Sequence, residues 1–549
     1  MSFAHVVHLV SSGLLLPTHG GSDNMAADMV MNGDDMGMEN LMTLPGLPLE
    51  WSEWVFAALV AIGIYAVFAK VPPSASARHL TLSRVPGVGS VMRAMTAGPW
   101  VLVGLKSIAV AVFAMVIASG LWGTPLAERS LATTLTWTIW WTLVIISVFF
   151  VGSAWCAVCP WYTLAGWLVK GRLWRRGKGR LRLNLKMPGL LRNVWPALFM
   201  FIGLTWLELG VGVTTSPVIT AALALVMVGL ASGFLVLFER KGFCRYVCPV
   251  GRTIGFYSQL APIELRAVDS DVCNRCTTLE CYHGTPQIDP CPTHLTMGRF
   301  AQNTYCTSCG ACVQACPYDN ISWRLRPMAA EARIGARPHW DEAWFMLGLL
   351  ALTSFHGVTM LPLWHQSMEV ISGVLGKSVP QLAAFSIGMI VCLVVPALVF
   401  AVVVAVTLKL AAGPIAYRKL FASLAFAMLP VAFAYHLAHN LDHLVRESAG
   451  FWHVVVNPFG IGMEPMTLAE RHAHMANLLL PEPVLFTFQA LLMVWGFWVA
   501  AQILRHRGRG LLTEGRDLAG WGVVPMVLFA GGVTAFNTWL LMQDMIMRM

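Results

Sequence analysis

The chain has 549 residues, of which 57% are hydrophobic and only 12% are charged, and its formal net charge is +9. A mean hydropathy of +0.65 is too apolar for an ordinary soluble domain. The composition predicts a mostly α, polytopic helical membrane protein in contact with lipid. The basic residues flank apolar segments, as in membrane topology signals, so we expect no nucleic-acid partner.

The amino-terminal segment is polar, acidic and rich in methionine. The first 53 residues contain no Lys or Arg and seven acidic residues. We therefore expect residues 1–50 to form a flexible tail outside the membrane, on the periplasmic side. Its thioethers could capture Cu(I), although a mobile tail without a ligand explains the composition equally well. The methionines are Met25, Met29, Met31, Met36, Met38 and Met42.

About ten apolar segments are long enough to cross a hydrocarbon core of about 30 Å. They lie at 52–70, 100–122, 132–153, 193–213, 218–238, 342–363, 381–408, 419–439, 484–504 and 522–542. Lys and Arg gather after the third segment and near Arg418 and Arg505, which predicts that these loops face the cytoplasm. Both termini then lie outside a bacterial inner membrane. The predicted domains are a five-span module at 51–238, a cytoplasmic insert at 239–341 and a second five-span module at 342–549.

Two cysteine pairs lie at the predicted cytoplasmic ends of the third and fifth spans, and each pair is followed by proline. They are Cys156 with Cys159, and Cys244 with Cys248. Four thiolates suffice for an iron–sulfur cluster or another metal. Redox-active thiols and simple packing are the other two interpretations. Cys392, alone inside an apolar span, is predicted to be a core residue.

The insert contains eight cysteines with ferredoxin-like spacing. Its second group reads C-x-x-C-x-x-C-x-x-x-C-P, and its first group is a stretched form of the same pattern. In two-cluster ferredoxins the last cysteine of each group ligates the other cluster. This predicts one 4Fe–4S cluster on Cys273, Cys276, Cys281 and Cys316, and a second on Cys306, Cys309, Cys312 and Cys291. The stretched spacing leaves the role of Cys281 open, and structural zinc is the alternative chemistry.

The segment Phe243–Gly251, with Cys244 and Cys248, and the later run Cys306–Pro317 resemble the membrane polyferredoxins of the NapH/NosR type. The resemblance covers about residues 132–325 and fades after 340. It departs at Cys156 and Cys159, which are one residue closer together than is usual in that family. It implies electron exchange between the quinone pool or the cytoplasm and a periplasmic redox partner, by way of 4Fe–4S clusters.

Histidines gather near the predicted outer ends of the later spans. His436, His439 and His443 share one helical face, and His356 lies at a similar depth in another span. Ionisable residues inside a membrane usually have a function. Facing imidazoles could hold a b-type haem, imidazoles with thioethers could bind copper, and the same residues with Asp442 could bind quinol and take its protons. Interfacial histidines that bond to loops are the remaining interpretation.

Together these features predict a membrane-bound iron–sulfur electron-transfer protein. It would link cytoplasmic 4Fe–4S clusters with a quinone, haem or metal centre at the outer face, as a component of an oxidoreductase. A periplasmic redox protein or a second membrane subunit would be its partner. The alternative function is a copper reductase or a maturation factor for a periplasmic metalloenzyme. The residues leave open the direction of electron flow and whether the chain is an enzyme by itself.

Overall fold

The computed structural model describes residues 43–69, 79–97, 99–171, 182–376, 380–411, 415–509 and 520–546. The chain divides into two units, Met1–Leu44 and Pro45–Met549. Of the first unit only the short strand β1 (Thr43–Leu44) is described. Residues 1–42 of the predicted methionine-rich tail and residues 172–181 of the basic loop after the third span lie outside the described residues.

Helices occupy all ten of the predicted apolar segments, so the prediction of a mostly α, polytopic fold is confirmed. Eight helical runs in the described part of the chain are long and apolar enough to cross a membrane. They are α3 (Leu49–Phe68), α5 (Pro99–Trp122), α6 to α7 (Leu131–Thr133, with η4 at Thr134–Trp140 and α7 at Trp141–Val151), α11 (Pro217–Leu237), α18 (Gln381–Leu410), α19 to α20 (Tyr417–Leu424, with η11 at Ala425–Ala427 and α20 at Met428–Glu447), α23 (Glu482–Arg509) and α24 (Val524–Met542).

Two predicted spans differ from this simple picture. Helix α10 (Trp195–Gly210) has 16 residues, and at 1.5 Å per residue it is shorter than a hydrocarbon core of about 30 Å. Helix α16 (Trp340–Val358) is followed by α17 (Pro362–Leu375) after a bend of 94°. Pro362 explains the break, because proline cannot donate the helical hydrogen bond and disfavours helical geometry at the preceding residue.

The run from α19 to α20 is the centre of the helical bundle. Its most apolar window is 94% buried, whereas that of α5 is only 6% buried. Helices α16, α23, α7 and α24 pack around α20, and the phenyl rings of Phe421, Phe426 and Phe433 fill the space between them. Apolar helices such as α5 and α18 therefore present most of their surface to lipid, while α20 is packed by protein on all sides.

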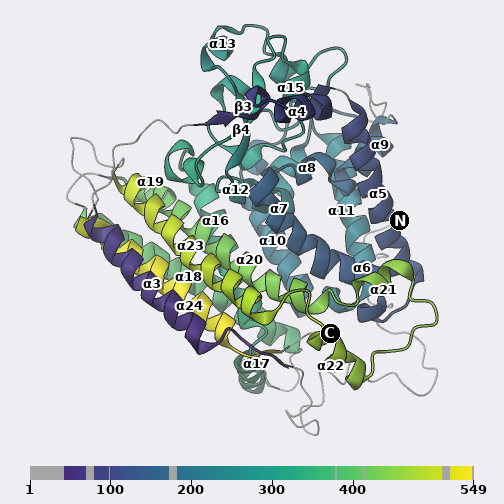
Figure 1. Cartoon of the computed structure of the whole chain (residues 1–549), viewed down its shortest axis with the longest axis vertical. Coiled ribbons are helices and arrows are strands. Elements are labelled where there is room, and N and C mark those ends of the chain that lie inside the picture. Colours follow the sequence, from purple (N-terminus) through teal and green to yellow (C-terminus); the bar gives the residue numbers. More distant parts are fainter. Residues whose placement is uncertain are drawn as a thin grey trace. The chain divides into compact units, whose positions relative to one another are not determined.

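The insert is built on a small antiparallel sheet at one end of the helices (Figure 1). Its order is β2 (Leu80–Thr81), β4 (Ile321–Leu325) and β3 (Ile263–Ala267). Strand β2 comes from the loop after the first span, so that loop and the insert lie on the same side. We call the end of the helical bundle that carries the insert the ferredoxin side. The opposite end of the bundle carries α21 (Phe451–Val456) and α22 (Leu468–Ala476) (Figure 1).

A buried ion-pair network fixes the sheet to the rest of the insert. Glu264 is 4% exposed, and its carboxylate lies 2.5 Å from Arg324 and 2.6 Å from Arg326. Burial alone would raise the pKa of Glu264, but Arg326, Arg266 and Arg324 hold it below its ordinary value. The guanidinium of Arg266 also pairs with Glu331. Removing one member would leave uncompensated buried charge, which is strongly destabilising.

The insert also packs directly against the helices. Arg507 of α23 donates hydrogen bonds to the carbonyl oxygens of Ala332 and Ala336, at 2.6 and 3.0 Å. Helix α12 (Pro249–Tyr257) packs against η9 (Asn303–Tyr305), and at this contact Gly255 lies so close to the Thr304 carbonyl that a Cβ would overlap it. A side chain at 255 would therefore push the two segments apart.

We expect Gly255→Ala to loosen the packing of η9 on α12 within the insert, because overpacking a tight contact typically costs about 1–3 kcal/mol. Limited proteolysis in detergent should cut this variant faster between residues 260 and 340, and its thermal midpoint should fall. Gly229→Ala is the matched control, since a Cβ at position 229 meets no atom within 4 Å. Equal protease resistance in the two variants would contradict the tight contact.

Candidate functional site

The structure gathers the cysteines of the insert into two groups of four. Burial raises the pKa of Cys281, and the neighbouring thiols Cys273, Cys276 and Cys316 raise it further. These are the four residues predicted for the first cluster, so Cys281 lies with the others despite the stretched spacing. We call them the first cysteine group.

The second cysteine group consists of Cys291, Cys306, Cys309 and Cys312. Burial raises the pKa of Cys312, and the other three thiols, followed by Cys281, raise it further. Burial likewise raises the pKa of Cys306 to about 12. Backbone N–H groups point at two of the sulfurs, from Leu295 to Cys291 at 3.3 Å and from Ser308 to Cys306 at 3.4 Å. Such N–H···S bonds tune the potential of an iron–sulfur cluster.

Each group supplies four thiols, the number that one 4Fe–4S cubane takes. No three His, Cys, Asp or Glu side chains of the described residues lie close enough to share one metal ion. Structural zinc holds its cysteine sulfurs about 2.3 Å from one point, whereas a 4Fe–4S cubane binds four thiolates at four separate irons. The two groups therefore fit the predicted clusters, which when bound supply one-electron redox chemistry.

The four cysteines at the span ends form a third group, which we call the inner group. Cys156 lies in helix α8 (Trp155–Val158) and Cys244 in the short helix η7 (Phe243–Val247), and Cys159 and Cys248 directly follow these two elements. Burial raises the pKa of Cys156 to about 11, with Cys244 as the next cause. Burial also raises the pKa of Cys159, and Cys244, Cys248 and Cys156 add to it. The structure thus brings the two pairs together, with all four sulfurs as free thiols.

Positive charge lies beside the inner group. Arg252 is 1% exposed, and both Arg252 and Lys241 act to lower the pKa of Cys156 and Cys244 against the dominant effect of burial. The Arg252 Nε is buried and has no hydrogen-bond partner among the described residues. A buried cation with an unused donor is suited to an anionic thiolate-bound centre. The donor set and the charge both fit a cluster here.

Two arginines connect the inner group with the second group. Arg252 donates to the carbonyl oxygen of Thr304 at 2.6 Å, and Arg245 donates to that of Thr293. Both guanidinium groups also lie over the ring of Tyr305, at 5.1 Å for Arg245 and 4.7 Å for Arg252. Tyr305 directly precedes Cys306, so these contacts press the inner group against the second group.

A second contact joins the inner group to the second group. The hydroxyl oxygens of Ser153 and Ser308 lie 3.0 Å apart, and they belong to the segments that carry Cys156 and Cys306. The three groups therefore lie in sequence: first, second, inner. The sequence predicted these twelve cysteines as ligands or redox thiols but did not predict which insert group faces the membrane.

A cavity of about 670 Å³ lies among the spans beside the inner group. Helices α5, α7, α10, α11 and α20 contribute to its wall. At the ferredoxin side it is lined by residues that neighbour the inner cysteines: Trp155, Val158, Pro160, Trp161, Pro249 and Val250. The indole N–H groups of Trp155 and Trp161 are buried donors without a partner among the described residues.

Aromatic rings follow one another from this end into the middle of the membrane. The ring of Trp140 lies 5.7 Å from those of Trp155 and Trp161 and 5.8 Å from that of Trp141. Trp141 in turn lies 5.6 Å from the ring of His436. Rings at these separations are packed against each other, so no gap separates the inner group from the cavity.

His436 is held by two hydrogen bonds. The indole N–H of Trp141 donates to Nε2 at 3.1 Å. In the neutral ring Nδ1 then carries the proton and donates to the Tyr257 hydroxyl at 3.2 Å. As a haem or copper ligand, His436 would have to give up the first of these bonds.

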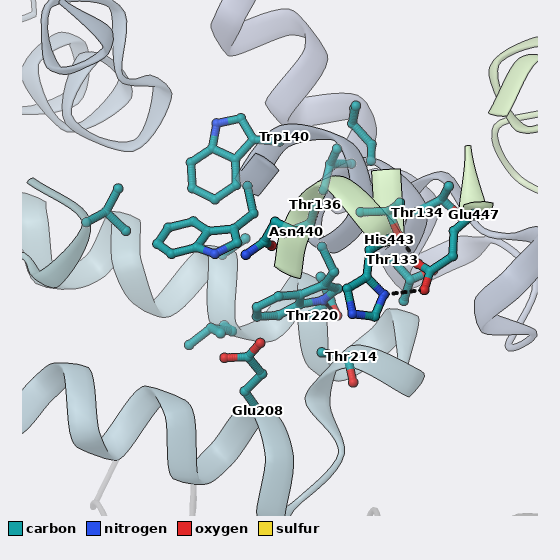
Figure 2. Close-up of a pocket in the computed structure, with 18 of the residues that line it drawn as sticks. Thr133, Thr134, Thr136, Trp140, Glu208, Thr214, Thr220, Asn440, His443 and Glu447 are labelled. Carbon is teal, nitrogen blue, oxygen red and sulfur yellow. Dashed lines mark hydrogen bonds and ion pairs between the residues drawn. The ribbon is translucent and has the colours of Figure 1, made fainter. Parts of the chain in front are cut away.

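The far end of the cavity is polar (Figure 2). His443 Nδ1 lies 2.5 Å from Glu447 Oε1, and Thr138 donates to the other carboxylate oxygen at 3.0 Å. On the facing wall His356 Nε2 lies 3.6 Å from Glu208, whose carboxylate points into the cavity (Figure 2). His439 lines the same cavity and lies 5.0 Å from His443, ring to ring. All four predicted histidines thus line one cavity.

Sequence reasoning missed Glu447 and the partner of Asp442. The spacing of His443 and Glu447, four residues apart in a helix, was the available signal. Asp442 pairs with Arg446 at 3.0 Å, so that salt bridge already engages the carboxylate predicted to help bind quinol. The haem and copper assignments stay predictions, and the methionines of residues 1–42 lie outside the described residues.

Comparison with known proteins supports the iron–sulfur chemistry. Two family models, each described as a 4Fe-4S binding domain, match residues 303–322 and residues 133–182 with 220–261. The second match includes both pairs of the inner group. The chain contains 4Fe–4S binding domains. No solved structure matches the chain.

Curated relatives match the same region. The putative electron transport protein YccM of Escherichia coli (strain K12) is 30% identical over 119 residues, which is 21% of this chain and 30% of the relative. The ferredoxin-type protein NapH of Escherichia coli (strain K12) is 26% identical over 194 residues, 32% of this chain and 64% of the relative. NapH of Haemophilus influenzae is 28% identical over 87 residues, 15% of this chain and 30% of the relative. The chain thus spans less than two thirds of the length of each relative.

These matches confirm the predicted resemblance. Over this region the chain is homologous to ferredoxin-type electron transport proteins, and its apolar helices make it a multi-pass membrane protein.

We expect Cys248→Ser to lower the iron content from about twelve to about eight atoms per chain, because three cubanes would become two. Iron and sulfide are measured after anaerobic purification in detergent. Cys392→Ser is the control, since Cys392 lies alone in α18. About eight iron atoms in the unaltered protein would contradict a cluster on the inner group.

We expect Arg252→Gln to lower the midpoint potential of the inner centre, because a nearby positive charge stabilises the more negative, reduced form. A decrease of about 60 mV corresponds to a tenfold change in a one-electron equilibrium. A redox titration followed by electron paramagnetic resonance measures it. Arg337→Gln, at an exposed position on the same side, should leave the potential unchanged. An unchanged potential in Arg252→Gln would contradict the role of this charge.

Proposed function

We propose that the protein carries electrons between the 4Fe–4S clusters of the insert and a quinone bound in the membrane cavity. One observation supports this most directly. The inner cysteine group contacts the second group on one side, through Arg252 and Thr304, and neighbours the cavity wall on the other, at Trp155 and Pro249. The redox groups and the cavity are therefore contiguous.

The cavity has the size and lining that a lipid-soluble ring requires. Ligand sites commonly measure about 300–1,000 Å³ and combine apolar walls with a few polar groups. Here the middle of the wall is aromatic, at Trp140 and Trp141, and the far end carries imidazoles and carboxylates. A quinone needs both, since its ring is apolar and its reduction takes up two protons with two electrons.

The hydrogen bonds of His436 argue against its use as a haem ligand, and those of His443 suit a quinone. A haem needs imidazole nitrogens with free lone pairs, but His436 Nε2 is engaged by Trp141. His443 uses Nδ1 with Glu447, and its Nε2 has no hydrogen-bond partner among the described residues. A free Nε2 on a carboxylate-bound imidazole is suited to accept a proton from a ligand hydroxyl.

The chain's own residues would position the ligand and manage charge. The cluster on the inner group supplies one-electron transfer when bound. Trp155 and Trp161 would donate hydrogen bonds to a quinone oxygen at the near end, and His443 would exchange a proton at the far end. Arg252 would offset the negative charge of the reduced inner centre. Packed side chains around the cavity keep bulk water away from the ligand.

The proposal extends to location and partners. Lys and Arg beside the spans favour a bacterial inner membrane with the insert in the cytoplasm. A soluble redox protein or a second membrane subunit would exchange electrons with the first cysteine group, because Cys276 and Cys273 of that group are partly exposed.

The test uses two phenylalanine variants on α11. Ala224 lines the cavity, whereas Ala222, two residues earlier, is exposed on the outer surface of the bundle. Ala224→Phe fills part of the cavity and should slow electron transfer to quinone at least tenfold, while Ala222→Phe should not. Purified protein is reduced with dithionite, freed of excess reductant and mixed with decylubiquinone, and the return of cluster absorbance is timed. Equal rates in the two variants would place the quinone reaction elsewhere.

A further inference from the structure

The two ends of the cavity differ in their capacity to handle protons. At the ferredoxin side the described lining residues are aromatic, aliphatic or proline, and none of them titrates near neutral pH. At the other end lie imidazoles and carboxylates from several segments: Glu128, Glu208, His356, His439, His443, Glu447 and His474. His436 lies between the two ends, and Trp141 and Tyr257 already engage both of its ring nitrogens. A proton that leaves a ligand in this cavity therefore meets most of its acceptors toward the polar end.

The course of the spans shows which face these acceptors reach. Arg418, at the start of the run to α20, lies 5.3 Å from the ring of Trp340, which begins α16 directly after the insert. The run therefore starts at the ferredoxin side and ends, at Glu447, on the opposite side. Thr138 agrees with this direction. Helix α7 ends two residues before Ser153, which contacts Ser308 of the insert. Thr138 lies 13 residues before that end of the helix, which corresponds to about 20 Å away from the ferredoxin side.

His443 and Glu447 form a pair in which each atom has a defined role. Nδ1 of His443 donates to the carboxylate, which Thr138 holds from the other side. Nε2 is left to receive a proton, and Glu447 would stabilise the imidazolium that forms. The charged and titratable groups around the pair are His439, Asp442 and Arg446 on α20, His474 on α22 and Glu128 on η3 (Ala127–Arg129).

A route continues beyond the pair. His474 Nε2 accepts from the Gly450 N–H at 3.1 Å and lies 3.3 Å from the carbonyl oxygen of Glu447. His474 also lines a second, smaller cavity of about 270 Å³, which is bounded by Glu128, Arg129 and Glu470. The side chain of Glu470 is 55% exposed. Titratable groups thus extend from His443 to the surface opposite the insert.

We propose that the redox reaction in this cavity separates charge across the membrane. The inference rests on the proposed function. When a hydroquinone is oxidised, its two O–H bonds break, two electrons pass one at a time to the clusters on the ferredoxin side, and two protons pass through His443 to the opposite side. When a quinone is reduced, the same electrons and protons enter from those two sides and two O–H bonds form. Each electron is matched by one proton on the other face.

Vesicles test this directly. The protein is reconstituted into liposomes that contain decylubiquinone in the bilayer and pyranine in the lumen, with valinomycin and potassium to dissipate voltage. Dithionite, added outside, is an impermeant reductant and reaches only molecules whose insert faces outward. We expect the lumen to become alkaline, with about one proton consumed per electron. Liposomes without protein correct for direct reduction of quinone at the outer surface.

The effect of membrane voltage on the rate of electron flow is a second measurement, separate from the change in lumen pH. Without valinomycin, electron flow should slow several-fold as voltage builds up, and a protonophore should restore it and abolish the pH change. If reduced clusters are reoxidised by quinone but the lumen pH stays constant, charge separation is wrong and the proposed function stands. If quinone does not reoxidise the clusters in detergent, the proposed function itself fails.

Variants locate the proton route. His443→Gln and Glu447→Gln should lower the rate of lumen alkalinisation at least tenfold and leave the iron content and cluster spectrum unchanged. Thr138→Val removes only the hydroxyl that holds Glu447, so it tests the same pair if the other variants fail to fold. Glu50→Gln is the control, because Glu50 is exposed in the first turn of α3 and lines neither cavity. Normal proton uptake in a folded His443→Gln variant would overturn the assignment of this route.

Discussion

Burial of cysteine sulfur at the boundary of the membrane is the constraint on which the rest of this structure depends. Cys248 is 3% exposed and Cys159 is 7% exposed, and burial raises the pKa of Cys156 to about 11. Thiols in such a place would stay protonated at neutral pH and could not serve as ligands. Only a metal centre and nearby cations make a thiolate stable there. Arg252 and Lys241 supply positive charge beside the inner group.

The same residues set the order of the redox groups. Arg252 places positive charge beside the inner group, and Arg252 and Arg245 also donate to the backbone beside Cys306 and Cys291 and stack on Tyr305. The arginine that places positive charge beside the inner group therefore also helps to hold the second group against it. Because electron transfer weakens steeply with distance, a chain of centres works only if each contact is tight. The buried arginines keep the second group and the inner group together, and Gly255 permits the close approach of α12.

Some of this could be predicted from sequence because the information is local. Cysteines with ferredoxin spacing lie two or three residues apart, so a short stretch of sequence is enough to predict them as cluster ligands. A membrane span is likewise predicted from the length and hydropathy of one continuous segment. The pairing of His356 with Glu208 joins α16 to α10, and strand β2 reaches the insert from the loop after the first span. Such contacts depend on how distant segments pack, which no local pattern encodes. The bend at Pro362 had a local signal, but its angle depends on the packing of α17 against α18.

The unequal lining of the cavity has a physical origin in what electrons and protons require. An electron can cross packed apolar side chains without any atom moving far, so the rings of Trp140, Trp155 and Trp161 present no obstacle at the near end. A proton must be passed between hydrogen-bonding groups, and an isolated charge in such a low-dielectric region is very costly. A wall without titratable groups therefore transmits electrons and stops protons. At the far end the pair of His443 and Glu447 offers such hydrogen-bonding groups, and Thr138 donates to the carboxylate of the pair. A single cavity with one lining of each kind is sufficient to send the two particles in opposite directions.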